Sequence, residues 1–439
     1  MAATVVGGGL ACRRGGGNDG PVDGLDDELA RIAEREPVVR AWVRRHSVDH
    51  LRGELDDPIP GPLDGWTLGV KDVIDVSGMA TERGSPIYAG RRTRNDAACV
   101  DLARRAGAIV VGKTATTEFA LVTPAVTTNP HNPDHTPGGS SSGSAAAVAD
   151  HMVRAALGTQ TVGSVLRPAA FCGVVGFKPT RSLIPLNGVG QLAPSFDTLG
   201  WFTRSVADAT AMFEAMTSSV PLRQWSPPDS PDQSAGERQS SSGRRLRIGK
   251  YRSHQWSAAQ PEMAAVLDSA ADQLADSGVE IVDVDPLAHL DGLFDAADTV
   301  LRYEIGRVFA WERDCHLDLL SPLFRKMLIR SDAVTVRDYG QAHLVIDDAR
   351  RAHREFMAAS QFDALLTPSA PGEAPSIKTT GDSAFNRVWT SLGVPAIHLP
   401  TGTGPLGLPV GIQLAGNVWA DTELLTAAAQ AEATFEAAR

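Results

Sequence analysis

Short apolar runs alternate with amphipathic segments along most of this chain, which predicts a mixed α/β fold. LDGWTLGVKDVIDV, which begins at Leu63, has the alternating apolar residues of a strand that enters a core. AIVVGKT, which covers residues 108–114, predicts a second strand. Between them, residues 96–106 predict a helix that Asp96 caps and Gly107 ends. Strand, helix and strand in this order indicate a mixed β-sheet covered by helices.

Further periodic segments predict helices on either side of this region. One helix starts at Leu25 and is expected to break near Pro37, and another runs between Pro261 and Gly278, before the strand VEIVDVD. Residues 291–330 predict helices whose aromatic residues could wall a substrate pocket, although core packing would explain these residues equally well.

Two segments differ in composition from the rest of the chain. Residues 1–22 are a Gly-rich lead, and residues 219–245 are a polar, Pro/Ser-rich insertion. Both are expected to be disordered, because they offer little apolar surface to bury. Residues 23–439 are therefore expected to form a single domain, although length alone would suggest two or three.

Composition excludes several classes of protein. The formal net charge is −11 and no basic cluster stands out, so no nucleic-acid partner is expected. No apolar run approaches the ~18 residues of a membrane span, and arginines follow the short apolar N-terminus, the reverse of a secretory signal. The four cysteines lie far apart, without CxxC spacing, which is typical of a reduced, cytoplasmic protein. No cofactor and no metal are expected.

The strongest chemical signal lies between Gly138 and Thr180. Ser140 and Ser164 each follow a glycine and stand 24 residues apart, and the small apolar residues between them predict a helix. Because glycine permits close approach of the backbone, the two hydroxyl groups could converge on one point. Lys71 lies in the first predicted strand, where a buried ammonium group would need polar partners.

Two shorter motifs are rejected because of their context. GAIVVGKT matches the phosphate-binding loop, but its variable residues predict a strand instead of a loop. Gly139, Ser141 and Gly143 match the nucleophile elbow of α/β-hydrolases, but turn residues precede them where an apolar strand is needed. His131 and His135 in that preceding segment are interpreted as exposed loop residues and not as metal ligands.

GVKD around Lys71, GGSSSG around Ser140 and GTQTVGS around Ser164 resemble the amidase signature family. GAIVVGKTATTEFA, FCGVVGFKPT and FNRVWTSLGVPAIHLPTG are also similar to that family. The likeness starts at about Leu25, with a signature core at about 60–205. It implies a large mixed β-sheet covered on both faces by α-helices, and hydrolysis or transfer of carboxamides by a Ser-cisSer-Lys triad without a cofactor.

The resemblance implies a role for each triad residue. Ser164 would be the nucleophile that becomes acylated, and Ser140, joined to Gly139 by a cis peptide bond, would bridge it to Lys71. Lys71 would be the general base and must be neutral, which burial favours because it lowers a lysine pKa. The structural alternative is an ion pair between Lys71 and a nearby aspartate. The backbone N–H groups that would bind the oxyanion belong to Thr161, Val162, Gly163 and Ser164.

The chain departs from the usual family pattern, GTDTGGSIRxPA, around the nucleophile. Gln160 replaces the acid, Val162 replaces a small residue, and the arginine falls one place later, at Arg167. Because Val162 adopts positive φ only at a cost, the turn must tolerate an L-residue there.

Three functions remain open. The leading one is an amidase, which could form a homodimer, that hydrolyses a small-molecule carboxamide to a carboxylate and ammonia or an amine. The second is the A subunit of a glutamyl- or aspartyl-tRNA amidotransferase, which would act as a glutaminase for a partner. The third is a catalytically impaired binding protein on the same fold, suggested by Val162.

Overall fold

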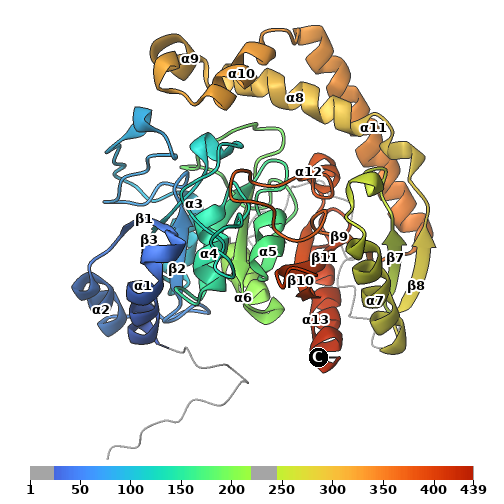
Figure 1. Cartoon of the computed structure of the whole chain (residues 1–439), viewed down its shortest axis with the longest axis horizontal. Coiled ribbons are helices and arrows are strands. Elements are labelled where there is room, and N and C mark those ends of the chain that lie inside the picture. Colours follow the sequence, from blue (N-terminus) through green and yellow to red (C-terminus); the bar gives the residue numbers. More distant parts are fainter. Residues whose placement is uncertain (1–23, 219–244, 439) are drawn as a thin grey trace, which may run out of the picture.

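A mixed β-sheet of 11 strands runs through the molecule (Figure 1). The computed structural model describes residues 24–218 and 245–438. The predicted lead at 1–22 lies outside these ranges, as does all of the predicted insertion at 219–245 except its last residue. The large mixed sheet predicted from the sequence is confirmed.

The strands are β1 (Trp42–Arg45), β2 (Thr67–Lys71), β3 (Ile109–Thr114), β4 (Ala155–Gln160), β5 (Val175–Lys178), β6 (Thr198–Thr203), β7 (Arg247–Tyr251), β8 (Glu280–Val284), β9 (Ala364–Pro368), β10 (Ala396–Thr403) and β11 (Pro409–Ala415). Across the sheet they follow the order β1-β3-β2-β4-β6-β5-β10-β11-β9-β7-β8. β2 is parallel to β3 and β4, and β7 is parallel to β8 and β9, whereas the other neighbours are antiparallel.

The α-helices are α1 (Leu25–Val39), α2 (Val48–Asp56), α3 (Ala98–Arg105), α4 (Ser142–Ala149), α5 (Leu166–Cys172), α6 (Val206–Ser218), α7 (Glu262–Asp276), α8 (Leu293–Val308), α9 (Ala310–His316), α10 (Pro322–Ser331), α11 (Val336–Ser360), α12 (Arg387–Leu392) and α13 (Asp421–Ala437). No helix in the described ranges is long and apolar enough to cross a membrane.

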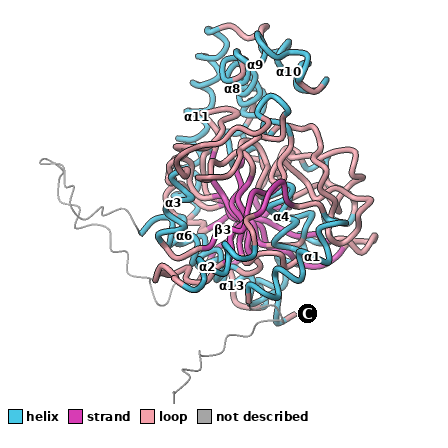
Figure 2. The backbone as a smooth tube through the Cα atoms, turned by 90° about the vertical axis from the view of Figure 1, so that its left-hand side faces the viewer, coloured by secondary structure: helices cyan, strands magenta, loops and turns pink. Residues whose placement is uncertain are grey.

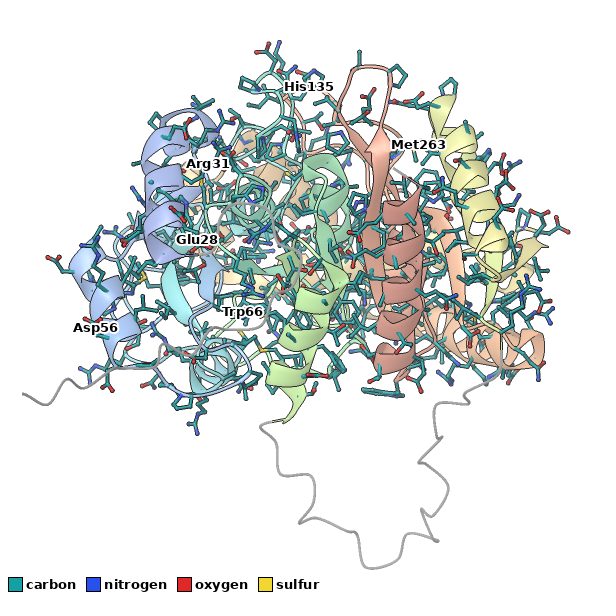
Figure 3. All side chains as sticks on the ribbon, turned by 90° about the horizontal axis from the view of Figure 1, so that it is seen from below. Glu28, Arg31, Asp56, Trp66, His135 and Met263 are labelled. Atoms are coloured by element: carbon teal, nitrogen blue, oxygen red, sulfur yellow. The ribbon has the colours of Figure 1, made fainter. Side chains whose placement is uncertain are left out.

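Helices cover both faces of the sheet, as predicted. In β4, Ala155 and Leu157 belong to a core cluster with α3, α6, α7 and α13, whereas Ala156 belongs to a cluster with α1, α4 and α5. Successive side chains of a strand alternate between the faces of a sheet, so β4 is buried on both sides. Figure 3 shows Arg31 on α1 at one end of the molecule and Met263 on α7 toward the other.

Helices α8 to α11 form a further layer beyond one end of the strands (Figures 1 and 2). Phe309 and Phe324 of this layer are buried, and their ring centroids lie 4.9 and 5.1 Å from that of Phe119. Trp311, by contrast, is 53% exposed. Core packing therefore accounts for Phe309 and Phe324 of the segment 291–330.

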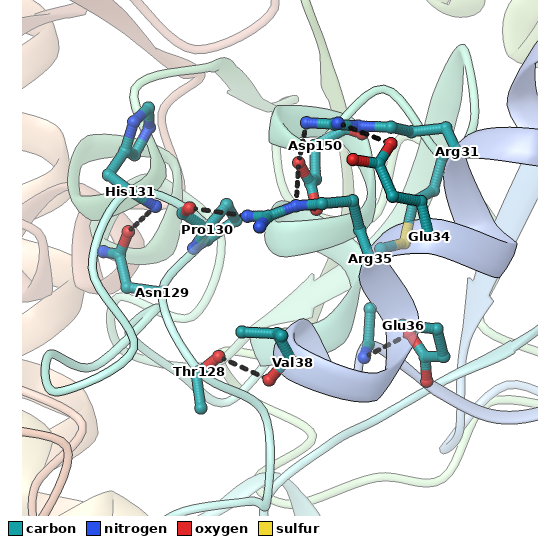
Figure 4. A network of polar contacts seen from close by, with 12 residues as sticks. Arg31, Glu34, Arg35, Glu36, Val38, Thr128, Asn129, Pro130, His131 and Asp150 are labelled. Atoms are coloured by element: carbon teal, nitrogen blue, oxygen red, sulfur yellow. Dashed lines mark hydrogen bonds and ion pairs between the residues drawn. The ribbon is translucent and has the colours of Figure 1, made fainter.

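Hydrogen bonds and ion pairs connect helix α1 to the end of α4 and to the segment that leads to Ser140 (Figure 4). Arg31 Nη2 and Arg35 Nε lie 2.5 and 2.9 Å from carboxylate oxygens of Asp150, the residue after α4. Arg35 also donates to Pro130 O at 3.0 Å. Because the side chain of Asp150 is only 3% exposed, its charge depends on these two arginines. The network fixes the first helix against the segment that carries the Gly/Ser turn.

Three local predictions are wrong. α1 does not break at Pro37 but continues to Arg40, a left-handed C-cap, because a proline in the last turn removes only one helical N–H. Asp96 does not cap α3; its carboxylate accepts from Ser77 N at 2.7 Å. The segment between the two predicted catalytic serines is not one helix, because α4 covers its first part and strand β4 its last.

Candidate active site

Lys71 ends β2, and its side-chain nitrogen lies inside the molecule between two hydroxyl groups. Nζ is 2.7 Å from Ser140 Oγ and 2.8 Å from Thr159 Oγ1. β4 runs parallel to β2 with Leu157 beside Val70, so Thr159 near the end of β4 comes next to Lys71. The family resemblance predicted the contact between Lys71 and Ser140, whereas no sequence pattern identified Thr159.

The environment of Lys71 disfavours its charged form. Lys71 is 0% exposed, and burial lowers its pKa well below the usual value, while the charge of Asp197 acts in the opposite direction. The nearby aspartates have other partners: Asp72 lies 2.9 Å from Lys113 Nζ, and Asp75 pairs with an arginine. A lysine with a lowered pKa and hydroxyl partners is suited to accept a proton.

The turn that carries Ser140 is held at several backbone positions. The Gly139–Ser140 peptide bond is cis. Thr117 N donates to Ser140 O at 3.2 Å. Gly138 has a φ of +83°, and a Cβ added to it would lie 2.7 Å from Pro168 Cα, so a glycine is required there. The turn therefore packs directly against α5.

Ser164 lies in the turn between β4 and α5. Arg167, three residues later, donates to Gly139 O at 2.6 Å and to Gly381 O at 2.8 Å. The first of these bonds ties the Ser164 turn to the peptide group that precedes Ser140. Ser164 is 6% exposed, and its hydroxyl group has no hydrogen-bond partner among the described residues. Ser164 Oγ is therefore available to contact a substrate.

The predicted oxyanion donors follow β4 directly. Within residues 24–218 and 245–438, no acceptor is recorded for the N–H groups of Val162, Gly163 and Ser164. Val162 does not have positive φ, so the turn accommodates this residue without left-handed strain. A Cβ at Gly163 would lie 2.7 Å from Asn386 Oδ1, so the glycine allows α12 to approach the turn.

Gln160 fixes the start of α5 and its contact with α12. Its Oε1 accepts from Val165 N and Leu166 N at 2.9 and 3.0 Å, and its Nε2 donates to Thr390 Oγ1 at 2.9 Å. Thr390 Oγ1 in turn donates to Val162 O at 3.0 Å. The replacement of the usual acid by Gln160 therefore supplies a side chain that both accepts and donates.

A buried carboxylate, Asp197, supports the same turn and was not predicted. It accepts from Thr161 Oγ1 at 2.5 Å and from the N–H groups of Leu192 and Ala193 at 2.8 and 3.1 Å. Burial raises the pKa of Asp197 to about 6, although these hydrogen bonds act in the opposite direction. No sequence motif surrounds Asp197, so only its burial among donors identifies it.

A small pocket, whose cavity volume of about 10 Å³ has room for roughly one water molecule, lies beside the turn. Its lining residues come from the turn, from the loop before β6, from α8 and from α12: Thr161, Val162, Phe196, Ala297, Asp298, Leu301, Arg387 and Ser391. The segment 291–330 thus contributes α8 to a pocket wall, in addition to its core residues.

The residues of the rejected motifs have other roles. Lys113 of GAIVVGKT lies in β3 and pairs with Asp72. Ser141 Oγ accepts from a backbone N–H of β4 at 3.4 Å. His131 is exposed as expected, but His135 is half-buried, and both rings lie against backbone carbonyl groups. In the described part of the chain, no group of three or more His, Cys, Asp and Glu residues could hold a metal ion.

Comparisons with known proteins agree with this arrangement of motifs. A family model described as Amidase matches residues 29–425. The chain is 32% identical to the A subunit of a glutamyl-tRNA(Gln) amidotransferase from Synechococcus sp. (strain RCC307), over 92% of each chain. The solved structure of native peptide amidase from Stenotrophomonas maltophilia has a TM-score of 0.76 and 30% identity, covering 94% of this chain and 93% of that one. The structure of 6-aminohexanoate cyclic dimer hydrolase has a TM-score of 0.81 and 27% identity, over 94% of each chain. With the motifs, the sheet and these matches in agreement, the chain belongs to the Amidase family.

Proposed function

We propose that this chain hydrolyses a small-molecule carboxamide to a carboxylate and ammonia or an amine, through an ester on Ser164. The observation that carries the proposal is the contact of 2.7 Å between Lys71 Nζ and Ser140 Oγ in a fully buried site. A buried lysine with a lowered pKa can serve as the base that activates a serine nucleophile.

In the proposed first half-reaction, Ser164 Oγ attacks the carboxamide carbon while its proton passes to Ser140 Oγ, and the proton of Ser140 passes to Lys71 Nζ. The free N–H groups of Val162 and Gly163 bind the oxyanion. The proton then returns from Lys71 through Ser140 to the leaving nitrogen, the C–N bond breaks, and the acyl group remains on Ser164.

In the proposed second half-reaction, a water molecule enters where the leaving group departed, and the proton transfers of that departure run in reverse. Ser140 and Lys71 take a proton from the water, whose oxygen attacks the ester carbon. The bond to Ser164 Oγ then breaks, this oxygen regains a proton, and a carboxylic acid is released. Thr159 Oγ1 contributes in both halves, because it can accept from the protonated form of Lys71.

The test is labelling with a serine-reactive fluorophosphonate, combined with ammonia release from a panel of aliphatic, aromatic and amino-acid amides. We expect Ser164→Ala to remove both labelling and hydrolysis while leaving the circular dichroism spectrum unchanged. Ser141→Ala is the matched control, because Ser141 belongs to the rejected nucleophile-elbow motif. Turnover of Ser164→Ala within tenfold of the parent protein would refute the nucleophile assignment, and unlabelled parent protein would favour the binding-protein alternative.

The second candidate function is the A subunit of a tRNA-dependent amidotransferase, which would release ammonia from glutamine for a partner. The 32% identity to such a protein, over 92% of both chains, favours it. A tagged copy of the chain, purified at native expression level, distinguishes the two functions. A second protein that co-purifies and is needed for glutamine hydrolysis would favour the amidotransferase, whereas full activity of the chain alone favours the amidase.

A further inference from the structure

Strand β8 lies at one end of the sheet, and one of its backbone edges has no described strand beside it (Figure 1). β8 pairs in parallel with β7, and Glu280 N donates to Leu246 O at 2.8 Å. Because alternate residues of a strand direct their backbone groups to the same neighbour, the N–H and C=O groups of Ile281 and Asp283 point away from β7. Among the described residues, no partner outside the strand ladder is recorded for these groups. The outer edge of β8 therefore offers hydrogen bonds to a further strand.

Two open pockets border the end of β8, one on each face of the sheet. Ile281 packs against the core cluster that includes α7, whereas Val284 packs against the cluster of α8 and α11. The pocket on the side of α7 has a volume of about 710 Å³, and the pocket on the side of α11 has one of about 460 Å³. Residues 283–286 line both pockets. Since the side chains of a strand alternate between the two faces, a strand added to β8 would direct them into the two pockets in turn.

The pocket beside α7 is acidic. Its charged lining residues are Asp268, Asp272, Asp283, Asp285, Lys250 and Arg252. Both basic side chains already pair with Asp268, and Lys250 also pairs with Asp283. No cation is recorded beside Asp272 or Asp285 among the described residues, and the side chain of Asp283 is 83% exposed. This excess of carboxylates favours a basic side chain from a partner.

The pocket beside α11 is mostly apolar. Phe356 and Phe362 line it, with their ring centroids 5.9 Å apart, and the ring of His289 lies 5.7 Å from that of Phe356. Its basic residue, Arg247, pairs with Glu280 at 3.4 Å. The volume of about 460 Å³ lies within the roughly 300–1,000 Å³ of typical ligand pockets. This pocket therefore suits an apolar or aromatic side chain.

We propose that the outer edge of β8 binds an extended segment of a partner protein, in which basic side chains alternate with apolar or aromatic ones. In strand addition of this kind, main-chain hydrogen bonds supply affinity and pockets for alternate side chains supply specificity. A second copy of the chain pairing through the same strand is disfavoured, because the two acidic edges would face each other. The proposal does not depend on amide hydrolysis, since β8 carries none of the residues of the proposed proton path.

The experiment measures fluorescence anisotropy of a fluorescein-labelled peptide in which lysine alternates with valine and phenylalanine. The comparison peptide has the same residues in two blocks, so that its net charge and composition are unchanged. We expect saturable binding of the alternating peptide, at least about tenfold tighter than that of the block peptide, which corresponds to one hydrogen-bonded charge. Equal affinity for the two peptides, or no saturable binding of the alternating one, overturns the proposal.

Two pairs of variants locate the binding site on the protein. Asp283→Pro and Asp283→Ala both remove the carboxylate, but only proline removes the outward N–H, and an edge strand tolerates proline where the N–H faces solvent. The proline variant should bind the alternating peptide about tenfold more weakly than the alanine variant. Asp272→Lys should also weaken binding about tenfold, whereas Asp276→Lys, an exposed position of α7 outside the pocket, should change it little. Equal binding within either pair overturns the proposal.

Backbone pairing is tested independently on the parent protein, in case the proline variant does not fold. Two versions of the alternating peptide are N-methylated at every second residue, in one register or the other. Only one version should lose binding, because only one set of N–H groups can face β8. Loss in both versions, or in neither, overturns the pairing. Self-association of the parent protein in sedimentation that Asp283→Pro abolishes would overturn the proposal in favour of a second copy of the chain.

Discussion

The hydroxyl group of Thr159 offers a direct test of the proposed proton path. Thr159 Oγ1 lies 2.8 Å from Lys71 Nζ, and the backbone oxygen of the same residue lies 3.4 Å away. Replacing Thr159 by valine puts a methyl group where the hydroxyl was, with almost no change of shape. The variant therefore removes one hydrogen-bond partner of Lys71 and leaves Ser140 Oγ in place.

The magnitude follows from the buried position of Lys71. A hydrogen bond to a charged group contributes about 1.5–3 kcal/mol, and 1.36 kcal/mol corresponds to one pKa unit. Since Thr159 Oγ1 accepts from the ammonium form, its loss should lower the pKa of Lys71 by about 1 to 2 units. If the positive charge on Nζ is half developed in the transition state, the plateau of kcat/KM should fall roughly 3- to 13-fold.

The assay measures kcat/KM between pH 5 and pH 10 on one amide. The acid limb reports protonation of the free enzyme's essential base, so in Thr159→Val it should move to lower pH. Thr159→Ser keeps the hydroxyl group and should keep the parent profile. An acid limb at the same pH as in the parent protein would show that the contact between Thr159 and Lys71 does not affect the pKa of the base. A shift to higher pH would show that Thr159 donates to the lone pair of a neutral Lys71.

Three further predictions follow from buried charges and from the proposed relay. Burial lowers the pKa of Lys178 to about 7, so between pH 7 and about 10 the unfolded chain binds this proton and the folded one does not. Stability should therefore rise with pH in that window, and the melting temperature of Lys178→Met should depend less on pH; equal dependence would contradict this. Asp150→Ala removes the buried carboxylate that both arginines bind and should destabilise the fold by about 3 kcal/mol in denaturant unfolding, the lower end for a broken buried pair, because the arginines are partly exposed. The control Glu34→Ala removes only an exposed pair and should change little. In single-substrate kinetics, Lys71→Ala/Ser140→Ala should lose far less than the sum of the two single losses, because residues of one relay are not additive; losses that add in kcal/mol would refute the relay.

The alternating apolar pattern was enough to predict the mixed sheet and most of its helices, because burial and turn residues leave a local signature. Thr159 left no such signature. It becomes a partner of Lys71 only because β4 pairs in parallel with β2 in the observed register. Pairing between strands 88 residues apart is not encoded in local periodicity. Asp197 was missed because only its contact with Thr161, which is distant in the sequence, links it to the nucleophile turn, although Leu192 and Ala193 are nearby donors.

Two of the three wrong local predictions have a common physical cause. One helix was predicted over the segment between the two serines because small apolar residues such as Ala156 and Leu157 suit a helix. The same residues also suit a strand that is packed on both faces, and the neighbours of β4 decide which structure forms. Tertiary contacts likewise engage Asp96 with Ser77 N instead of the helix end.

The replacement of the usual acid by Gln160 has a consequence for how α12 is held on the nucleophile turn. A carboxylate at position 160 could accept from the two N–H groups at the start of α5, but it could not donate to Thr390 Oγ1. Thr390 would then have to turn its own proton toward the carboxylate, and Val162 O would lose its donor. Gln160 avoids this conflict, since its amide donates to Thr390 and leaves the hydroxyl proton for Val162. The glutamine therefore helps hold α12 on the nucleophile turn.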